Sequence, residues 1–471
     1  MTIPEYQKTL DTLQVEIFRL SKENEELRKE NKRLRDILNK NSSNSSKPPS
    51  SDINTPKPQS LREKSGKLPG GQNGHCGYTL NQMPNPTNTI LHRAERCSCG
   101  CSLEEVTPKF IKRRQVFDIP ILKVEVTEYQ IEVKSCPVCG KEVESSFPEI
   151  VQAPVQYGSN ITALASYLMN YQLIPFNRTS VFFRDIFAVP VSEGWLGDTR
   201  KRFSLAIEDS VGKVKNMLKK SNVVNFDETG ISHNGKLEWL HTVSSEKATH
   251  YEIHPKRGTE AMNDIGVLPN FEGTAIHDHW SSYYKFDCKH AECNAHILRE
   301  LKFLHEENAQ EWAKSMSTHL IRAKTCREDS IARGMVNMDK NLLNEIELQF
   351  DKILQKGYAD NPETNRTEHK KRGRPKKTRA LNMLERMKDY KNNILAFLYN
   401  FDLPFDNNLA ERDIRMEKVR QKISGTIRGK NSCKEIANIR GYISTVKKNG
   451  ISVISATKDA FNGYPFVPSF S

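Results

Sequence analysis

The chain has 471 residues, a formal net charge of +13 at pH 7, and ten cysteines. Its length allows two to four domains at about 150 residues each, and its positive charge favours an anionic partner, most often nucleic acid. It lacks the run of about eighteen apolar residues that a membrane-spanning helix needs, and its polar N-terminus does not resemble a secretory signal. Cysteines without an export signal favour metal binding over disulfides. We therefore expect a soluble, cytoplasmic protein that contacts no membrane.

Residues 6–40 carry a heptad repeat typical of a coiled coil. Every d position is leucine, and two a positions are asparagine, which lowers stability but favours a two-stranded, in-register pair. The leucines are Leu13, Leu20, Leu27 and Leu34, and the asparagines are Asn24 and Asn31. We predict a zipper that joins the chain into a homodimer or a higher oligomer. The alternative is a single amphipathic helix packed on the body of the protein.

Residues 41–80 are dominated by serine, asparagine, proline and glycine, with several lysines. Such a composition cannot bury enough apolar surface to form a core. The segment is predicted to be a basic, flexible linker, which either lies along DNA or serves only as a tether.

Two cysteine clusters lie within residues 81–150, which we predict to form a small zinc-binding domain. Cys136-Pro-Val-Cys139-Gly has the spacing of a zinc knuckle, in which two thiolates bind one ion and glycine opens the turn. The other cluster, Cys97-Ser-Cys99-Gly-Cys101, is one residue shorter than the usual spacing, and Cys101 offers another pairing. The predicted Zn²⁺ ligands are Cys97, Cys99, Cys136 and Cys139; the alternative is free cysteines. Alternation in residues 117–133 predicts a strand or hairpin that carries the second knuckle.

Residues 151–218 have the apolar spacing of helices, with a break at Pro175 and a turn after Pro190. Helix-turn-helix DNA-binding motifs show this pattern. Any small helical bundle shows it too, so the segment is predicted to be helical and remains only a candidate DNA-binding unit.

Two predicted strands each end in an aspartate, Asp227 and Asp278, with a hairpin predicted between them. A third carboxylate, Glu411, lies in the first turns of a helix that Asp406 or Asn407 would cap. Two strand-end aspartates and one helical glutamate are the minimum for a two-metal phosphoryl-transfer site, and oxygen ligands suit Mg²⁺ or Mn²⁺. The alternative for Asp227 is a capping residue in a surface turn.

Three further residues near these acids have side chains that could bind metal. Glu228 is left outside the metal site because it points to the opposite face from Asp227 if the strand continues. Cys293 and His296 open a predicted helix and have metal-ligand character. Because no partner pair of ligands is in view, we interpret them as packing and hydrogen-bonding residues.

Basic residues concentrate in two places. Residues 305–400 are predicted to be helical and charged, with a basic, extended interruption whose guanidinium groups can enter a narrow minor groove; the alternative is a solvated loop. The helix that carries Glu411 also has a basic face, and the loop after it is suited to phosphate contacts. The residues predicted to bind DNA are Arg372, Arg374, Lys376, Arg412, Arg415, Lys418 and Arg428. Residues 431–471 are predicted to form a basic C-terminal helical region.

With these motifs, the chain resembles transposases of the insertion-sequence-66 family over nearly its whole length. The most specific strings are Ser-Lys-Pro-Pro-Ser-Ser-Asp at residues 46–52 and Asn-Asn-Leu-Ala-Glu-Arg at residues 407–412. The other shared strings are Pro69–His75, the Cys-Gly knuckles, Asp227–Thr229, Cys293–His296 and Arg372–Pro375. The chain departs from the family where Asp278-His279-Trp280 replaces the usual Asp-Gly-Tyr, and where the first knuckle is short by one residue.

The resemblance implies a ribonuclease-H-like mixed α/β catalytic core at residues 219–430, with a DDE triad that maps to Asp227, Asp278 and Glu411. It also implies a long helical insertion between the last two acids. The implied reaction is metal-dependent hydrolysis at an element end to give a 3′-hydroxyl, which then attacks target DNA. Mg²⁺ or Mn²⁺ is the implied cofactor, and helper proteins of the same element are candidate partners.

We therefore expect a multidomain α+β protein that catalyses DNA transposition. One competing class is a non-catalytic DNA-binding regulator with the same zipper and zinc knuckles, which would need no divalent ion in its core. The other is a stand-alone nuclease on the same core, which would cut DNA without joining it.

Overall fold

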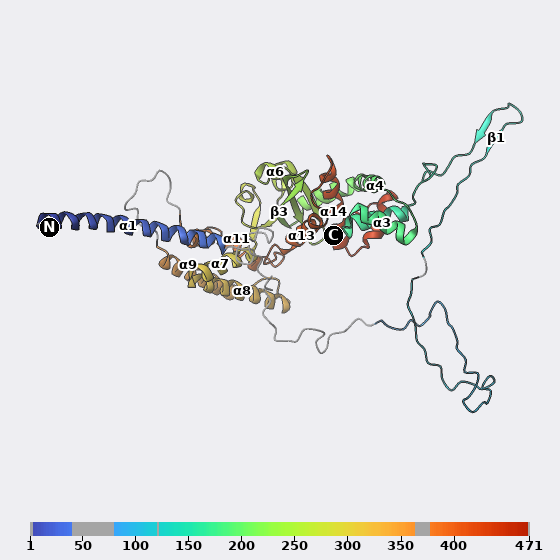
Figure 1. Cartoon of the computed structure of the whole chain (residues 1–471), viewed down its shortest axis with the longest axis horizontal. Helices are drawn as coiled ribbons and strands as arrows, with labels where there is room; N and C mark the ends of the chain where they lie inside the picture. Colours follow the sequence, from blue (N-terminus) through green and yellow to red (C-terminus); the bar gives the residue numbers. More distant parts are fainter. Residues whose placement is uncertain (1–2, 40–79, 120–121, 363–376, 470–471) are drawn as a thin grey trace.

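The computed structural model describes residues 3–39, 80–119, 122–362 and 377–469. Helix α1 (Ile3–Leu38) extends away from the body of the protein, as Figure 1 shows. Its end is tied to the body where Asn39 Nδ2 donates to Glu307 Oε2 at 2.6 Å. The leucines at the d positions, Leu13, Leu20, Leu27 and Leu34, are 45–57% exposed. The helix thus presents an apolar stripe to solvent in the single chain.

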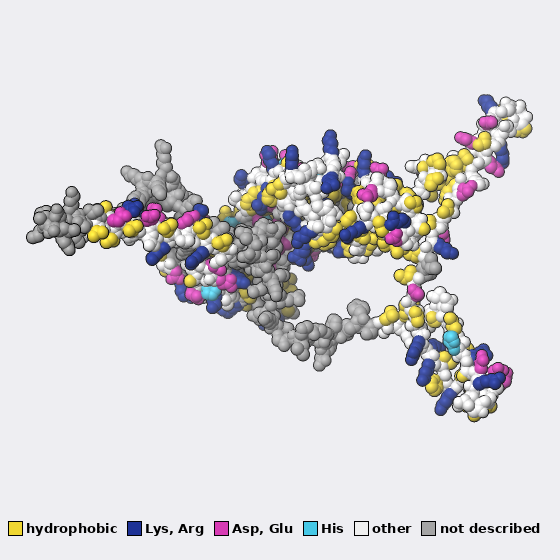
Figure 2. All heavy atoms as spheres, viewed as in Figure 1, with side chains coloured by type: hydrophobic (Ala, Val, Ile, Leu, Met, Phe, Trp, Pro, Cys, Tyr) yellow, Lys and Arg dark blue, Asp and Glu magenta, His cyan; other side chains and the backbone are white. Residues whose placement is uncertain are grey.

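Residues 80–158 contain little regular structure. Strands β1 (Val133–Ser135) and β2 (Glu142–Glu144) form a short antiparallel hairpin around the second cysteine knuckle. The longer strand predicted from residue 117 is absent from the described residues before Val133, and Val116 and Val126 are almost fully exposed. An alternating strand needs a second layer to cover its apolar face. Figure 2 instead shows apolar side chains along slender arms beside the body.

A helical body follows. Its N-terminal helices are α2 (Ser159–Ser166), a π-helical turn (Tyr167–Tyr171), α3 (Phe176–Phe187), α4 (Glu193–Ala206) and α5 (Glu208–Lys219). Helix α4 begins where Ser192 Oγ accepts from the Trp195 amide at 3.1 Å, because a serine N-cap satisfies a free helical N–H. The C-terminal helices α14 (Ser432–Lys448) and α15 (Val453–Phe461) share a core with α4, which contains Phe203 and Ile443. The segments predicted as 151–218 and 431–471 therefore pack together as one unit.

A five-stranded mixed sheet follows α5 along the chain. Its strands are β3 (Val223–His233), β4 (Lys236–Ser244), β5 (Thr249–His254), β6 (Thr274–His277) and β7 (Lys289–Glu292), in the order β5-β4-β3-β6-β7. β3 pairs antiparallel with β4 and parallel with β6, and β6 pairs parallel with β7. Asn234 and Gly235 both have positive φ, which suits the tight turn between β3 and β4. Helix α6 (Thr259–Ile265) and α5 contribute to the core on one face of the sheet, with Phe226.

The helical insertion packs as a unit against the β6–β7 edge. Its helices are α7 (Asn294–Asn308), α8 (Glu311–Ala332), α9 (Lys340–Asp360), α10 (Arg379–Asp389), α11 (Lys391–Ile394) and α12 (Ala396–Tyr399). Its core includes Trp312 and Leu384 and extends to Ile276 of β6. Gly357 allows α9 to approach this core, since a Cβ there would lie 2.5 Å from Leu384. Across the described ranges, no helix is long and apolar enough to cross a membrane.

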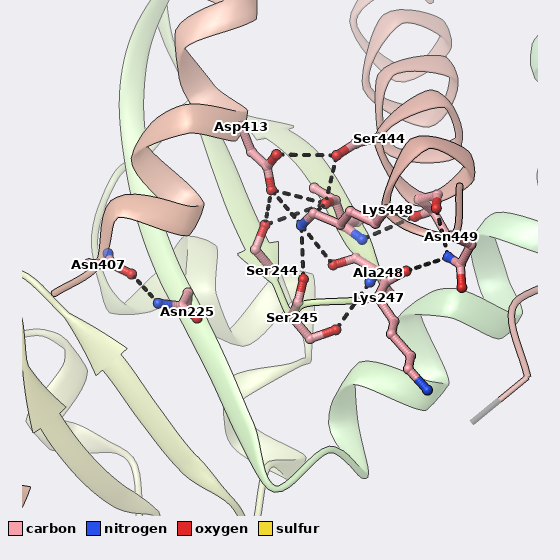
Figure 3. A network of polar contacts seen from close by, with 12 residues as sticks. Asn225, Ser244, Ser245, Lys247, Ala248, Asn407, Asp413, Ser444, Lys448 and Asn449 are labelled. Carbon is pink, nitrogen blue, oxygen red and sulfur yellow. Dashed lines mark hydrogen bonds and ion pairs between the residues drawn. The ribbon is translucent and has the colours of Figure 1, made fainter. Parts of the chain in front are cut away.

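Helix α13 (Asn408–Ser424) returns from the insertion to the sheet and is fixed there by a polar network, drawn in Figure 3. Asp413 accepts from Lys448 Nζ at 2.8 Å and from the hydroxyls of Ser244 and Thr249 at 2.5 and 3.0 Å. Because Lys448 lies on α14, this one carboxylate joins α13, the sheet and the C-terminal helices.

Candidate active site

The two aspartates predicted at strand ends lie on neighbouring parallel strands. The last residue pair between β3 and β6 is Asn225 with Ile276. Asp227 and Asp278 each follow this pair by two residues, so they stand at the same level of the sheet. β6 ends at His277, whereas β3 continues past Asp227 to His233.

Asn407 holds the start of α13, the helix that carries Glu411, against β3. Its side-chain amide donates to the Phe226 carbonyl and accepts from Asn225 Nδ2, both at 2.8 Å. Figure 3 shows the side chains of Asn407 and Asn225 pointing at each other. Its backbone N–H points at Cys293 Sγ at 3.1 Å. Since Glu411 follows one helical turn later, the anchor beside Phe226 sets its position relative to Asp227.

Asp278 and Glu411 lie near enough to Asp227 to affect its pKa. Burial raises the pKa of Asp227 well above the usual range of an aspartate. The neighbouring carboxylates raise this pKa further, in the order Glu228, Asp278, Glu411. Burial also raises the pKa of Glu411, against the opposing effect of Arg299. Neighbouring carboxylate oxygens are suitable ligands for a divalent cation such as Mg²⁺, which would relieve the repulsion that raises the pKa of Asp227.

Helix α7 supplies the partners of Glu411 that the sequence did not reveal. Arg299 Nη2 lies 3.4 Å and His296 Nδ1 lies 3.7 Å from Glu411 Oε1. Burial lowers the pKa of His296 to about 3, so its imidazole stays neutral. Cys293, His296 and Glu411 place ligand atoms within 4.8 Å of one another. The interpretation of Cys293 as a packing and hydrogen-bonding residue agrees with its burial and its contact with Asn407.

A family model described as Transposase IS66 family matches residues 154–434, which is more than half of the chain. The chain belongs to the IS66 transposase family. A second model, a family of unknown function (DUF6444), matches residues 1–81. No match is found among curated proteins. Membership gives the chain a role in transposition, as a DNA-processing enzyme with DNA as its partner.

Glu228 of this transposase lies on the opposite face of β3 from Asp227, with Phe226 and Tyr283. Arg257 pairs with it at 2.6 Å, and the Tyr283 hydroxyl donates to its other oxygen. Arg257 itself lies over the rings of Trp280 and Trp239, at 4.2 and 5.0 Å from their centroids. Burial raises the pKa of Glu228 to about 7, and the Asp278 carboxylate adds to this effect.

The residue after Asp278 has a backbone conformation that favours glycine. His279 has φ of +71°, a left-handed conformation that glycine adopts without steric cost. Its imidazole compensates with contacts of Nδ1 to Glu292 Oε1 at 2.5 Å and to the Tyr284 hydroxyl at 3.1 Å. Glu292 is in turn held by Arg386 of α10 at 3.4 Å. The conformation beside Asp278 is thus fixed by residues of the sheet edge and of the insertion.

The predicted DNA-binding residues of the transposase differ in their surroundings. Arg412, Arg415 and Arg428 are exposed. Lys418 instead donates from Nζ to the Gly230 carbonyl of β3, and burial lowers its pKa. Lys418 therefore ties α13 to β3, and its side chain is only partly exposed to solvent. Arg372, Arg374 and Lys376 lie outside the described residues.

The predicted zinc ligands form two separate turns. Cys97, Cys99 and Cys139 are exposed and Cys136 is partly buried. Hydrogen bonds from neighbouring backbone amides lower the pKa of Cys97 and of Cys136, which favours the thiolate that binds metal. The segments that carry the two turns lie on different arms in Figure 1, and the metal-ligand groups found among the described residues do not include these cysteines.

Proposed function

We propose that this IS66-family transposase is a DDE enzyme with a ribonuclease-H-like core that cleaves DNA at element ends and joins them to target DNA. The juxtaposition of Asp227 and Asp278 on parallel strands, with Glu411 on a helix that Asn407 holds against β3, is the observation that carries this proposal. The strand order β5-β4-β3-β6-β7, with one antiparallel side and one parallel side, supports the proposed core.

Asp227, Asp278 and Glu411 would hold Mg²⁺ or Mn²⁺. When bound, two such ions activate the attacking oxygen and stabilise the leaving oxygen. Arg299 orients Glu411 by contacting Oε1, which leaves Oε2 free to act as a ligand. Neutral His296 adds no charge beside that ligand. Asn407 keeps α13 in register with β3, which limits how far Glu411 can move relative to Asp227.

Two in-line displacements at phosphorus follow from this assignment. In the first, a water oxygen forms a bond to the phosphorus at the element end, and the bond to the 3′ oxygen breaks to leave a 3′-hydroxyl. In the second, that hydroxyl loses its proton and attacks a target phosphorus, whose own 3′ oxygen leaves. No covalent enzyme intermediate is involved.

Further parts of the proposal concern assembly and DNA contact. Arg412, Arg415 and Arg428, with the basic segment that contains Arg372, Arg374 and Lys376, would contact DNA phosphates and grooves. Helix α1 would pair two protomers so that two DNA ends are held together. The four cysteines Cys97, Cys99, Cys136 and Cys139 would bind structural Zn²⁺ after the two knuckles approach each other. Helper proteins of the element are candidate partners, and the cytoplasm is the expected location.

A cleavage and joining assay on element-end DNA tests the function. With Mg²⁺, Asp227→Asn and Glu411→Gln should each reduce both steps by more than about 100-fold, since even outer-shell changes at metal sites cost 10–100-fold. DNA binding should persist in both variants, and Glu272→Gln, at an exposed acid before β6, should behave as the wild type. Unchanged strand transfer in Asp227→Asn protein would overturn the assignment. Metal-independent binding without nicking would favour a regulator, and nicking without joining would favour a nuclease.

A further inference from the structure

A second group of potential metal ligands meets at the far end of β3. His233 ends this strand, Glu238 lies on β4, and Cys433 lies in the first turn of α14. One nitrogen, one carboxylate oxygen and the sulfur lie within 4.8 Å of one another. His233 is six residues beyond Asp227, which is about 20 Å along an extended strand. The group is therefore separate from the proposed active site.

The strand register explains the approach of His233 and Glu238. His233 pairs with Lys236, so Glu238 stands diagonally opposite, two residues further along β4 and on the same face. His233 Nδ1 lies 2.8 Å from Glu238 Oε1, and Cys433 Sγ lies 3.7 Å from Glu238 Oε2. Ligand atoms around a tetrahedral Zn²⁺ ion are about 3.2–3.8 Å apart, given bonds of 2.0–2.3 Å. Small side-chain movements would thus bring all three to one ion.

The hydrogen-bonding neighbours of the His233 ring are compatible with a metal ligand at Nδ1. Nε2 faces the Gly429 carbonyl at 3.0 Å, and Nδ1 faces the Glu238 carboxylate. Both of these groups are acceptors, but a neutral imidazole carries one N–H. The Asn234 side-chain amide, 3.0 Å from Nε2, can turn its oxygen to that nitrogen. With Asn234 Nδ2 donating to Nε2, a neutral ring donates from Nδ1 to Glu238; with that amide turned, Nε2 donates to Gly429 and Nδ1 is either protonated or available to a metal ion. Metal-bound histidines commonly donate their other N–H to a backbone carbonyl, as Nε2 would to Gly429.

Cys433 completes the donor set from an apolar wall. It packs in a buried cluster that includes Ile231, Leu240 and Ile427. Burial, with a further effect from Glu238, raises the pKa of its thiol to about 12, so without metal it is neutral. A divalent ion would displace the thiol proton. One thiolate and one carboxylate then balance its two positive charges, and no net charge is left in this wall.

We propose that His233, Glu238 and Cys433 form a site for a divalent transition metal, with Zn²⁺ the best match to a nitrogen, oxygen and sulfur donor set. Water completes the coordination from the solvent side. The ion would hold α14 and the loop after α13 to the β3–β4 hairpin. This loop already contacts the hairpin, where Asn234 N–H donates to Ile427 and Ile427 N–H donates to Ser232, both at 2.8 Å. The exposed Arg428 lies on this loop, so the ion would fix a proposed DNA contact.

Co²⁺ titration of the reduced, metal-free full chain tests the site, because cobalt bound to thiolate gives a near-ultraviolet charge-transfer absorption. Cys433→Ser should bind one Co²⁺ fewer per chain than the wild type and lose part of this absorption. The cysteines of the two knuckles are present in both proteins, so their contribution cancels in the difference. Cys326→Ser, at a half-buried cysteine of α8, should match the wild type.

His233→Gln provides a second comparison, since glutamine retains a donor for the Gly429 carbonyl but cannot replace the imidazole as a ligand. It should also bind one Co²⁺ fewer, and Zn²⁺ should raise its thermal midpoint less than that of the wild type. Equal stoichiometry and equal absorption in wild type, His233→Gln and Cys433→Ser would overturn the proposal. The cluster would then be an imidazolium–carboxylate pair beside a buried thiol.

Discussion

Carboxylates that are close in sequence have different partners in this protein. Glu411 contacts Arg299 and His296 of α7, whereas Asp413 accepts hydrogen bonds from Ser244 and Lys448 and joins three elements. Glu228 is next to Asp227 but pairs with Arg257 on the other face of β3. The side-chain periodicity of a strand or helix therefore determines which acids point towards the proposed metal site.

His279→Gly should destabilise the protein by about 1 kcal/mol, although glycine suits the local backbone. Removing the left-handed strain stabilises the folded state by about 1 kcal/mol. Losing a hydrogen bond to a buried charge destabilises it by about 1.5–3 kcal/mol. Urea unfolding measures the difference. Ala309→Gly is the matched control, because Ala309 is exposed and also has positive φ, and this change should stabilise the fold. A more stable His279→Gly variant would contradict the role of the Glu292 contact.

His241 should make folding stability depend on pH. Burial lowers its pKa from 6.5 to about 4. Between these values the unfolded chain binds a proton that the folded chain excludes, so stability falls as pH falls. The wild type should lose on the order of 3 kcal/mol more than His241→Gln between pH 7 and pH 4. Parallel denaturation curves at both pH values measure this effect, and equal losses in the two proteins would refute it.

At the scale of elements, α13 depends on Asn407 for its position. Asn407→Ala would leave the Asn225 amide and the Phe226 carbonyl without these buried partners, at about 1–3 kcal/mol each. We expect a loss of roughly 3 kcal/mol in unfolding free energy and at least about 10-fold in DNA cleavage, because Glu411 would shift.

The neighbouring exposed residue provides the control for Asn407. Asn408→Ala should change unfolding and cleavage little, since the Asn408 backbone N–H would keep its bond to Asp406 Oδ1. Wild-type cleavage by Asn407→Ala protein would show that Glu411 is positioned by other contacts.

The sequence predicted the parts of this site that local patterns encode. Apolar runs that end in Asp227 and Asp278 predicted their strands. The start of α13 was also predicted, but the Asn407 side chain does not cap the helix and binds β3 instead. The continuation of β3 to His233 was not predicted, because only pairing with β4 reveals it. The approach of Arg299 and His296 to Glu411 was also not predicted, since it depends on how α7 packs. The strand expected from residue 117 does not form in the described residues, because no layer covers it.

At the scale of the whole molecule, helix α1 has an apolar stripe on a long projecting element. Exposed leucines at a heptad spacing are costly in a lone helix and gain most from an identical partner. Family membership implies a protein that processes DNA, and pairing of two protomers would let it hold two DNA ends.

We expect a dimer paired through α1, and Leu20→Glu combined with Leu27→Glu should convert it to a monomer, because both carboxylates would enter the seam. Light scattering coupled to gel filtration measures the mass. Val15→Glu, on the same helix but outside the a and d positions and 70% exposed, should leave the dimer intact. A monomeric wild type, or a dimeric double variant, would exclude pairing through α1.

The network around Asp413 has a consequence for synthesis of the protein. Lys448, which neutralises Asp413, is translated more than two hundred residues after Asp227. A nascent chain that stops before α14 can form the β3–β4 hairpin, yet the helix that carries Glu411 lacks its charged anchor. Because contacts so distant in sequence form late in folding, α13, already held at its start by Asn407, would gain its charged anchor only as the last helices leave the ribosome. Premature termination before α14 would then leave α13 without the ion pair between Asp413 and Lys448.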